Sequence, residues 1–131
     1  MIADPRRARH EALVRALEAA GLDALLVTSR ANVRYLTGFS GSAALAVATL
    51  ADLLLVTDFR YDEQARAEAG AVARVEVDSA SVWARLFREL PSLGPLSLIG
   101  YEAQALSVKD AERLAQAGNA WRWSATSGSP S

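Results

Sequence analysis

The chain has 131 residues, enough for one domain with a single hydrophobic core and too few for two. Its 14 Lys and Arg residues nearly balance its 15 Asp and Glu residues, so the net charge of −1 lacks the basic excess that nucleic acid or an anionic membrane surface attracts. Cysteine is absent and His10 is the only histidine, which excludes disulfides, thiolate catalysis and metal sites rich in sulfur or imidazole.

The N-terminal segment predicts a helix followed by a buried strand. Asp4 and Pro5 are typical of a helix start, apolar residues then recur on one face, and Gly21 ends the helix. The unbroken apolar run 24–27 is typical of a strand covered on both faces, so we expect it at the centre of a sheet. No apolar stretch has the length of a signal peptide or a membrane span, and we expect a cytoplasmic protein with no membrane partner.

A short helix and a hairpin are expected next. Ser29 predicts the start of the helix and Gly38 its end. The apolar runs 43–49 and 53–57 are separated by three residues, too few for a crossover helix, so they predict two antiparallel strands.

The second half predicts strands that alternate with helices. Asp58 is expected to cap a helix over 59–69, and the period-two pattern of 73–77 predicts a strand near an edge. The remaining elements are a helix from Ser81 that stops at Pro91, a strand over 96–99, a helix that Ser107 opens and Gly118 ends, and a strand over 120–123. This order predicts an α/β three-layer sandwich, a mixed sheet with helices on both faces. We expect the domain to span 1–123 and residues 124–131, with four serines, to form a flexible tail or the start of a linker.

Catalytic motifs are not visible in the residues. Gly38-Phe39-Ser40-Gly41 has the wrong spacing for a nucleophile elbow and precedes a strand instead of a helix. His10 has no partners at metal-ligand spacing, so a surface histidine is the favoured interpretation. One group stands out: Tyr35, Phe39, Phe59, Arg60 and Tyr61 fall at or just beyond the ends of expected strands. Such ends often bind ligands, and aromatic and arginine side chains often anchor interfaces, but core packing explains the aromatic residues equally well.

Arg60 has a further peculiarity. It lies in the first turn of the helix expected after Asp58, where the helix dipole disfavours a cation. We expect no local partner for Arg60 and therefore an external carboxylate, either on a partner domain or on a bound peptide.

Three segments resemble a known family: 32–42 (NVRYLTGFSGS), 54–65 (LLVTDFRYDEQA) and 99–102 (IGYE). Their order and spacing resemble the N-terminal domain of the creatinase, prolidase and Xaa-Pro aminopeptidase family over about residues 6–123. The resemblance implies a six-stranded mixed sheet flanked by helices. It also implies that catalysis belongs to a separate C-terminal metallopeptidase domain, in which two Asp, one His and two Glu hold two divalent metal ions such as Mn, Zn or Co. None of those ligand segments is in this chain, so the catalytic domain is absent from it and no cofactor is expected here.

The resemblance further implies a role for this domain. It would be the non-catalytic part of a proline-specific hydrolase, inactive alone, which forms homo-oligomers and controls the access of proline-containing peptides to the metal site of the missing domain. On the matching positions Phe39, Arg60 and Tyr61 are the candidate contact residues. The alternative is a standalone α/β binding module of the same fold for a small ligand or a protein partner.

Overall fold

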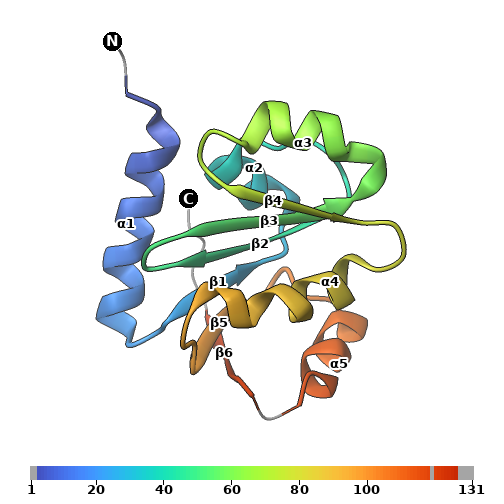
Figure 1. Ribbon diagram of the computed structural model, residues 1–131. Helices are drawn as coiled ribbons and strands as arrows, with labels where there is room; N and C mark the ends of the chain where they lie inside the picture. Colours follow the sequence, from blue (N-terminus) through green and yellow to red (C-terminus); the bar gives the residue numbers. More distant parts are fainter. Residues whose placement is uncertain (1–2, 119, 127–131) are drawn as a thin grey trace.

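A computed structural model describes residues 3–118 and 120–126 as one six-stranded mixed sheet with helices on both faces, which confirms the expected fold class (Figure 1). The strand order is β4-β3-β2-β1-β5-β6. The elements in chain order are α1 (Pro5–Ala20), β1 (Ala24–Val27), α2 (Arg30–Thr37), β2 (Ala44–Thr49), β3 (Leu53–Asp58), the 3₁₀ turn η1 (Phe59–Tyr61), α3 (Asp62–Ala69), β4 (Arg74–Asp78), α4 (Val82–Glu89), the 3₁₀ turn η2 (Leu90–Leu93), β5 (Leu98–Glu102), α5 (Val108–Gln116) and β6 (Arg122–Thr126).

Only β2 runs against the other strands. It pairs antiparallel with both β1 and β3, while the β1–β5, β3–β4 and β5–β6 pairs are parallel. The predicted hairpin of β2 and β3 is therefore confirmed, as is the central position of β1, and β4 lies at an edge as expected. As a consequence, all the strands except β2 end on the same side of the sheet. We call this side, where the carboxyl ends of the five parallel strands lie, the carboxyl edge; it is distinct from the edge strands β4 and β6.

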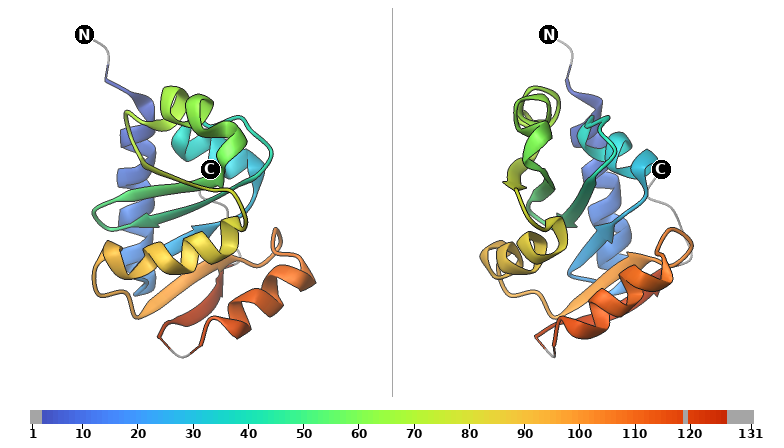
Figure 2. Two further views of the ribbon diagram at one scale, coloured as in Figure 1. Left: turned by 45° about the vertical axis from the view of Figure 1, so that its right-hand side comes forward. Right: turned by 90° about the vertical axis from the view of Figure 1, so that its right-hand side faces the viewer.

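The two faces of the sheet carry separate hydrophobic cores. Helices α1, α2 and α3 bury their apolar residues against one face, and α4 and α5 bury theirs against the other. Figure 2 (right) shows α1 and α2 on one side of the sheet and α4 on the other. Both faces of β1 are covered, and all four of its residues are buried, which explains the unbroken apolar run in the sequence.

Helix starts follow the capping residues that the sequence predicts. The side chains of Asp4, Ser29 and Ser107 each accept a hydrogen bond from a backbone N–H of the first turn. Gly21 and Gly38 end α1 and α2 with φ of +70° and +85°, the left-handed conformation that glycine adopts without strain.

Some expected boundaries differ from the structure. The helix expected over 59–69 divides into η1 and α3, while the helix from Ser81 stops at Glu89, just before Pro91 as expected, and continues as the 3₁₀ turn η2. The strand expected over 96–99 begins at residue 98, because the Asp23 carboxylate accepts the N–H groups of Ser97 and Leu98 and so fixes the register against β1.

The domain boundary expected at Trp123 is also placed too early. Strand β6 continues to Thr126, because Ser124, Ala125 and Thr126 pair with β5. Residues 124–126 of the expected tail are therefore part of the sheet. The rest of that tail, 127–131, lies outside the described residues.

Candidate functional site

The residues singled out by the sequence gather at the carboxyl edge. Turn η1, with Arg60 and Tyr61, follows directly from the end of β3. The loop 38–43, which contains Phe39, leads into β2, and because β2 is antiparallel to β3 this loop lies beside η1. We call this group, Phe39, Phe59, Arg60 and Tyr61, the edge cluster.

Tyr61 is held in place from two sides. Its hydroxyl lies 2.9 Å from the Ser42 hydroxyl, and its ring meets the ring of Phe39 edge-on, with the centroids 5.6 Å apart. The hydrogen bond to Ser42 is the main cause that lowers the pKa of the Tyr61 hydroxyl below its usual value. Gly41 is needed for this packing, because a Cβ at that position would lie 2.2 Å from the Phe39 ring.

The members of the edge cluster differ in exposure. Phe39 is fully buried, so its contribution to any contact is to support the Tyr61 ring from below. Phe59 is 55% exposed and the Arg60 side chain 66% exposed. Tyr35, grouped with them in the sequence analysis, contacts Arg9 of α1 instead, whose guanidinium carbon lies 4.5 Å from the Tyr35 ring centre. The exposed surface of the cluster is therefore made by η1.

The expectation that Arg60 has no local partner is wrong. Asp58 Oδ1 accepts hydrogen bonds from both the backbone N–H of Arg60, at 2.9 Å, and its side-chain Nε, at 3.1 Å. These bonds, the backbone one first, hold the pKa of Asp58 below its usual range. Asp58 therefore caps η1 as predicted, and it also fixes the direction of the Arg60 side chain, whose guanidinium carbon lies 5.7 Å from the Tyr61 ring centre.

The loop beside η1 is held by a carboxylate of α3, which local sequence motifs did not single out. Glu68 of α3 accepts hydrogen bonds from the backbone N–H and the hydroxyl of Ser40. The carbonyl of Ser40 in turn accepts a bond of 2.8 Å from Arg30. The loop under the edge cluster is thus braced from α2 and from α3.

Glu102, the last residue of β5, is a buried acidic residue that binds the backbone following β1. The helices that follow β1 and β5 pack on opposite faces, and the crevice between two such parallel strands is the usual ligand position in open α/β sheets. Here it holds the Glu102 carboxylate, 5% exposed, which accepts hydrogen bonds from Thr28 N–H (2.8 Å), Ser29 N–H (3.0 Å) and Asn32 Nδ2 (2.6 Å). A side chain of the protein therefore occupies the place where a small anion would bind.

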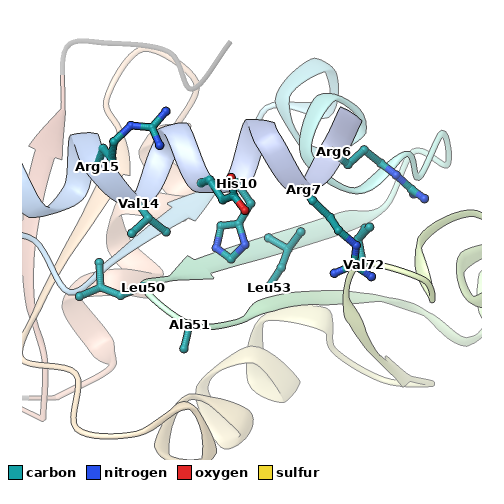
Figure 3. Close-up of a pocket in the computed structure, with 10 residues that line it drawn as sticks. Arg6, Arg7, His10, Val14, Arg15, Leu50, Ala51, Leu53 and Val72 are labelled. Atoms are coloured by element: carbon teal, nitrogen blue, oxygen red, sulfur yellow. The ribbon is translucent and has the colours of Figure 1, made fainter. Parts of the chain in front are cut away.

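A groove of about 420 Å³ lies away from these residues, between α1, the β2–β3 turn and the segment before β4 (Figure 3). His10 points into it and its Nε2 lies 2.9 Å from the carbonyl oxygen of Thr49. Charges of both signs line the groove, including Arg7, Arg15 and Glu11, and one guanidinium nitrogen of Arg7 already donates to the Ala71 carbonyl. The His10 ring and the Arg7 guanidinium therefore each have a backbone carbonyl of this chain as a partner.

Residues 3–118 and 120–126 contain neither a metal-binding cluster nor a membrane-spanning helix. In this part of the chain no three His, Asp or Glu side chains gather where they could hold a metal ion. The described residues therefore do not provide ligands for the divalent metals, which the resemblance assigns to a separate domain. Nor does any helix there combine the length and apolarity needed to cross a membrane.

Comparison with known proteins gives a consistent result. The family model for the creatinase/prolidase N-terminal domain matches residues 9–128. The uncharacterized peptidase YqhT of Bacillus subtilis (strain 168) is 48% identical over 56 residues, which are 43% of this chain and 16% of that protein.

Solved structures agree over nearly the whole chain. The N-terminal domain of the cytoplasmic peptidase PepQ from Mycobacterium tuberculosis H37Rv is 31% identical, with a TM-score of 0.83 over 94% of this chain and 95% of that one. The Xaa-Pro dipeptidase from Bacillus anthracis is 25% identical, with a TM-score of 0.86 over 94% of this chain. The present chain spans about a third of that dipeptidase, 34%.

Proposed function

The chain belongs to the creatinase/prolidase N-terminal domain family, and from this premise we propose that it is the non-catalytic domain of a cytoplasmic Xaa-Pro dipeptidase or aminopeptidase. Its work is to join subunits and to restrict the access of proline-containing peptides to a catalytic domain that holds the divalent metal. The edge cluster is the part of this domain that meets the partner subunit or the peptide, with Arg60 and Tyr61 at the surface and Phe39 beneath them.

A comparison of two arginines carries the proposal. Asp4 holds Arg6 by the same two bonds that Asp58 makes with Arg60, to the backbone N–H and to Nε. Arg6 is 17% exposed and uses Nη1 on the carbonyl oxygens of Thr37 and Glu68. Arg60 is 66% exposed, and its side-chain bond to Asp58 is made through Nε. A guanidinium that is held at Nε and is largely exposed is suited to bind a carboxylate with two hydrogen bonds.

The surroundings favour a carboxylate next to an apolar group. Phe59 is 55% exposed beside Arg60, and the Tyr61 ring is fixed by Ser42 and Phe39. A short peptide that ends in proline presents such a pair, and so does an acidic side chain on a partner subunit. The alternative of a small-ligand module has less support, because Glu102 fills the usual ligand position of the sheet.

The test is a chimera in which residues 1–126 replace the N-terminal domain of the Bacillus anthracis dipeptidase. Arg60→Ala is compared with Arg66→Ala, a matched control in α3, 55% exposed and ion-paired with Asp62. We expect Arg60→Ala to raise KM for an Xaa-Pro dipeptide several-fold, or to weaken the oligomer, while the melting temperature moves by no more than a degree or two. Arg66→Ala is expected to leave all three quantities unchanged.

Two results would count against the proposal. If both variants behave alike, Arg60 is not a contact residue. If the chimera folds, binds its metal and yet has no peptidase activity, this domain does not serve a peptidase of that class.

A further inference from the structure

Strand β6 forms one edge of the sheet, and its pairing shows which backbone groups face outward. The N–H of Arg122 donates to the Ser97 carbonyl at 2.8 Å, and the carbonyl of Thr126 accepts from Ala103 N–H. Because peptide groups alternate along a strand, the even-numbered residues of β6 bond to β5. The N–H and C=O groups of Trp123 and Ala125 therefore point to the open side, where the described chain has no further strand.

We propose that this edge pairs with the β6 edge of a second copy of the chain, antiparallel and about a two-fold axis through Ser124. In this register Trp123 lies opposite Ala125 of the second copy, and Ala125 lies opposite its Trp123. Each of these pairs exchanges two N–H···O=C bonds, so the two N–H and two C=O groups that each copy directs outward all find partners. The proposal rests on the subunit-joining role proposed above and assigns to it a second surface, apart from the edge cluster.

The side chains suit the same register. Trp123 is large and half-buried on the α5 side of the sheet, and it would lie beside the small, exposed Ala125 of the second copy. On the other side of the sheet the two Ser124 side chains meet, and they are small and uncharged. The Arg122 side chains are the only charges on the strand and would be about 13 Å apart, beyond the range of strong repulsion in physiological salt.

The other edge strand, β4, carries charges that disfavour pairing with another chain. This leaves β6 as the edge strand that can associate. Strand β4 carries Arg74, Glu76 and Asp78, each ion-paired with a residue of α4. Charged edge strands of this kind resist pairing with another chain. Strand β6, with a single charge, has no such protection.

The experiment uses a pair of complementary charges at Ser124, a half-buried position on the polar side of β6. Ser124→Lys and Ser124→Glu each place like charges opposite one another in the proposed dimer. Sedimentation equilibrium of each variant, of the wild type and of an equimolar mixture gives the dissociation constants. Ala19→Lys, on the exposed side of α1, is the matched charge control, and circular dichroism checks that each variant is folded.

The expected result is a wild-type dimer, a dissociation constant at least tenfold weaker for each Ser124 variant, recovery of the dimer in the mixture, and no effect of Ala19→Lys. A wild type that stays monomeric at several hundred micromolar overturns the proposal. Dimers of unchanged strength in both Ser124 variants also overturn it, since the interface then lies elsewhere, although subunit joining itself would survive. If the folded variants dissociate but the mixture does not recover, the two-fold register about Ser124 is wrong.

Discussion

Removal of the Glu102 carboxylate tests whether this side chain organises the β1–α2 junction. Glu102→Ala removes the acceptor of three hydrogen bonds, which come from Thr28 N–H, Ser29 N–H and Asn32 Nδ2. An unsatisfied buried donor costs about 1–3 kcal/mol, and entry of water recovers part of the sum, so we expect a loss of about 3–5 kcal/mol in the free energy of unfolding. This is a large part of the stability of an ordinary domain, about 5–15 kcal/mol.

Urea unfolding followed by circular dichroism measures this loss. With an m-value of about 2 kcal/mol/M, the midpoint is expected to fall by about 2 M. Glu102→Gln keeps an oxygen for the two backbone donors but turns an amide towards Asn32, so its loss is expected to be smaller. Glu112→Ala, at an exposed position in α5, is the control and is expected to change stability by less than about 0.5 kcal/mol. If Glu102→Ala is as stable as that control, the carboxylate does not hold the junction.

Three further results are expected. The pKa of Asp4 is lowered to about 2 by its hydrogen bonds to Arg6. Its charge therefore stabilises the fold above the ordinary pKa of 3.8, and this contribution is lost as the pH falls towards 2. In acid-unfolding curves, the stability difference between wild type and Asp4→Asn should vanish over that range. Gly41→Ala displaces the Phe39 ring and should cost about 1–3 kcal/mol in urea unfolding, with a changed near-ultraviolet tyrosine signal, whereas an unchanged signal would mean that the ring has room to move. Dialysis against Mn or Zn followed by elemental analysis should find well under one equivalent of metal per chain, and one tightly bound equivalent would contradict the proposed division of labour.

Local signals in the sequence predicted the elements well. The caps at Asp4, Ser29 and Ser107 act over two or three residues, so the residue types alone indicate where helices begin. The buried run of β1 and the short link of the hairpin are similarly local. Contacts between distant segments left no such signal. Glu102 and Asp23 both accept backbone N–H groups more than seventy residues away, and nothing beside either residue indicates that partner.

The two Asp-x-Arg segments show which contacts of an arginine can be predicted from the sequence and which cannot. Both place an aspartate at a helix start and bind the arginine two residues later through N–H and Nε. The clamp is local and was open to prediction, and the expectation that Arg60 lacked a partner overlooked it. What the outer nitrogens meet is decided by the fold, which brings the carbonyls of Thr37 and Glu68 to Arg6 and leaves Arg60 exposed. Exposure, and not the motif, therefore separates a structural arginine from a candidate contact.

The end of the sheet shows how a boundary error affects the interpretation of function. Ser124, Ala125 and Thr126 are small or polar residues that resemble a linker, and strand propensity does not favour a strand that includes serine and alanine. Pairing with β5 overrides that preference, and the Thr126 hydroxyl adds a bond to the Tyr101 carbonyl. If β6 ended at Trp123, only the backbone groups of Trp123 would point to the open side of the strand. The three extra residues create the two-residue edge of Trp123 and Ala125 on which a two-fold pairing about Ser124 depends.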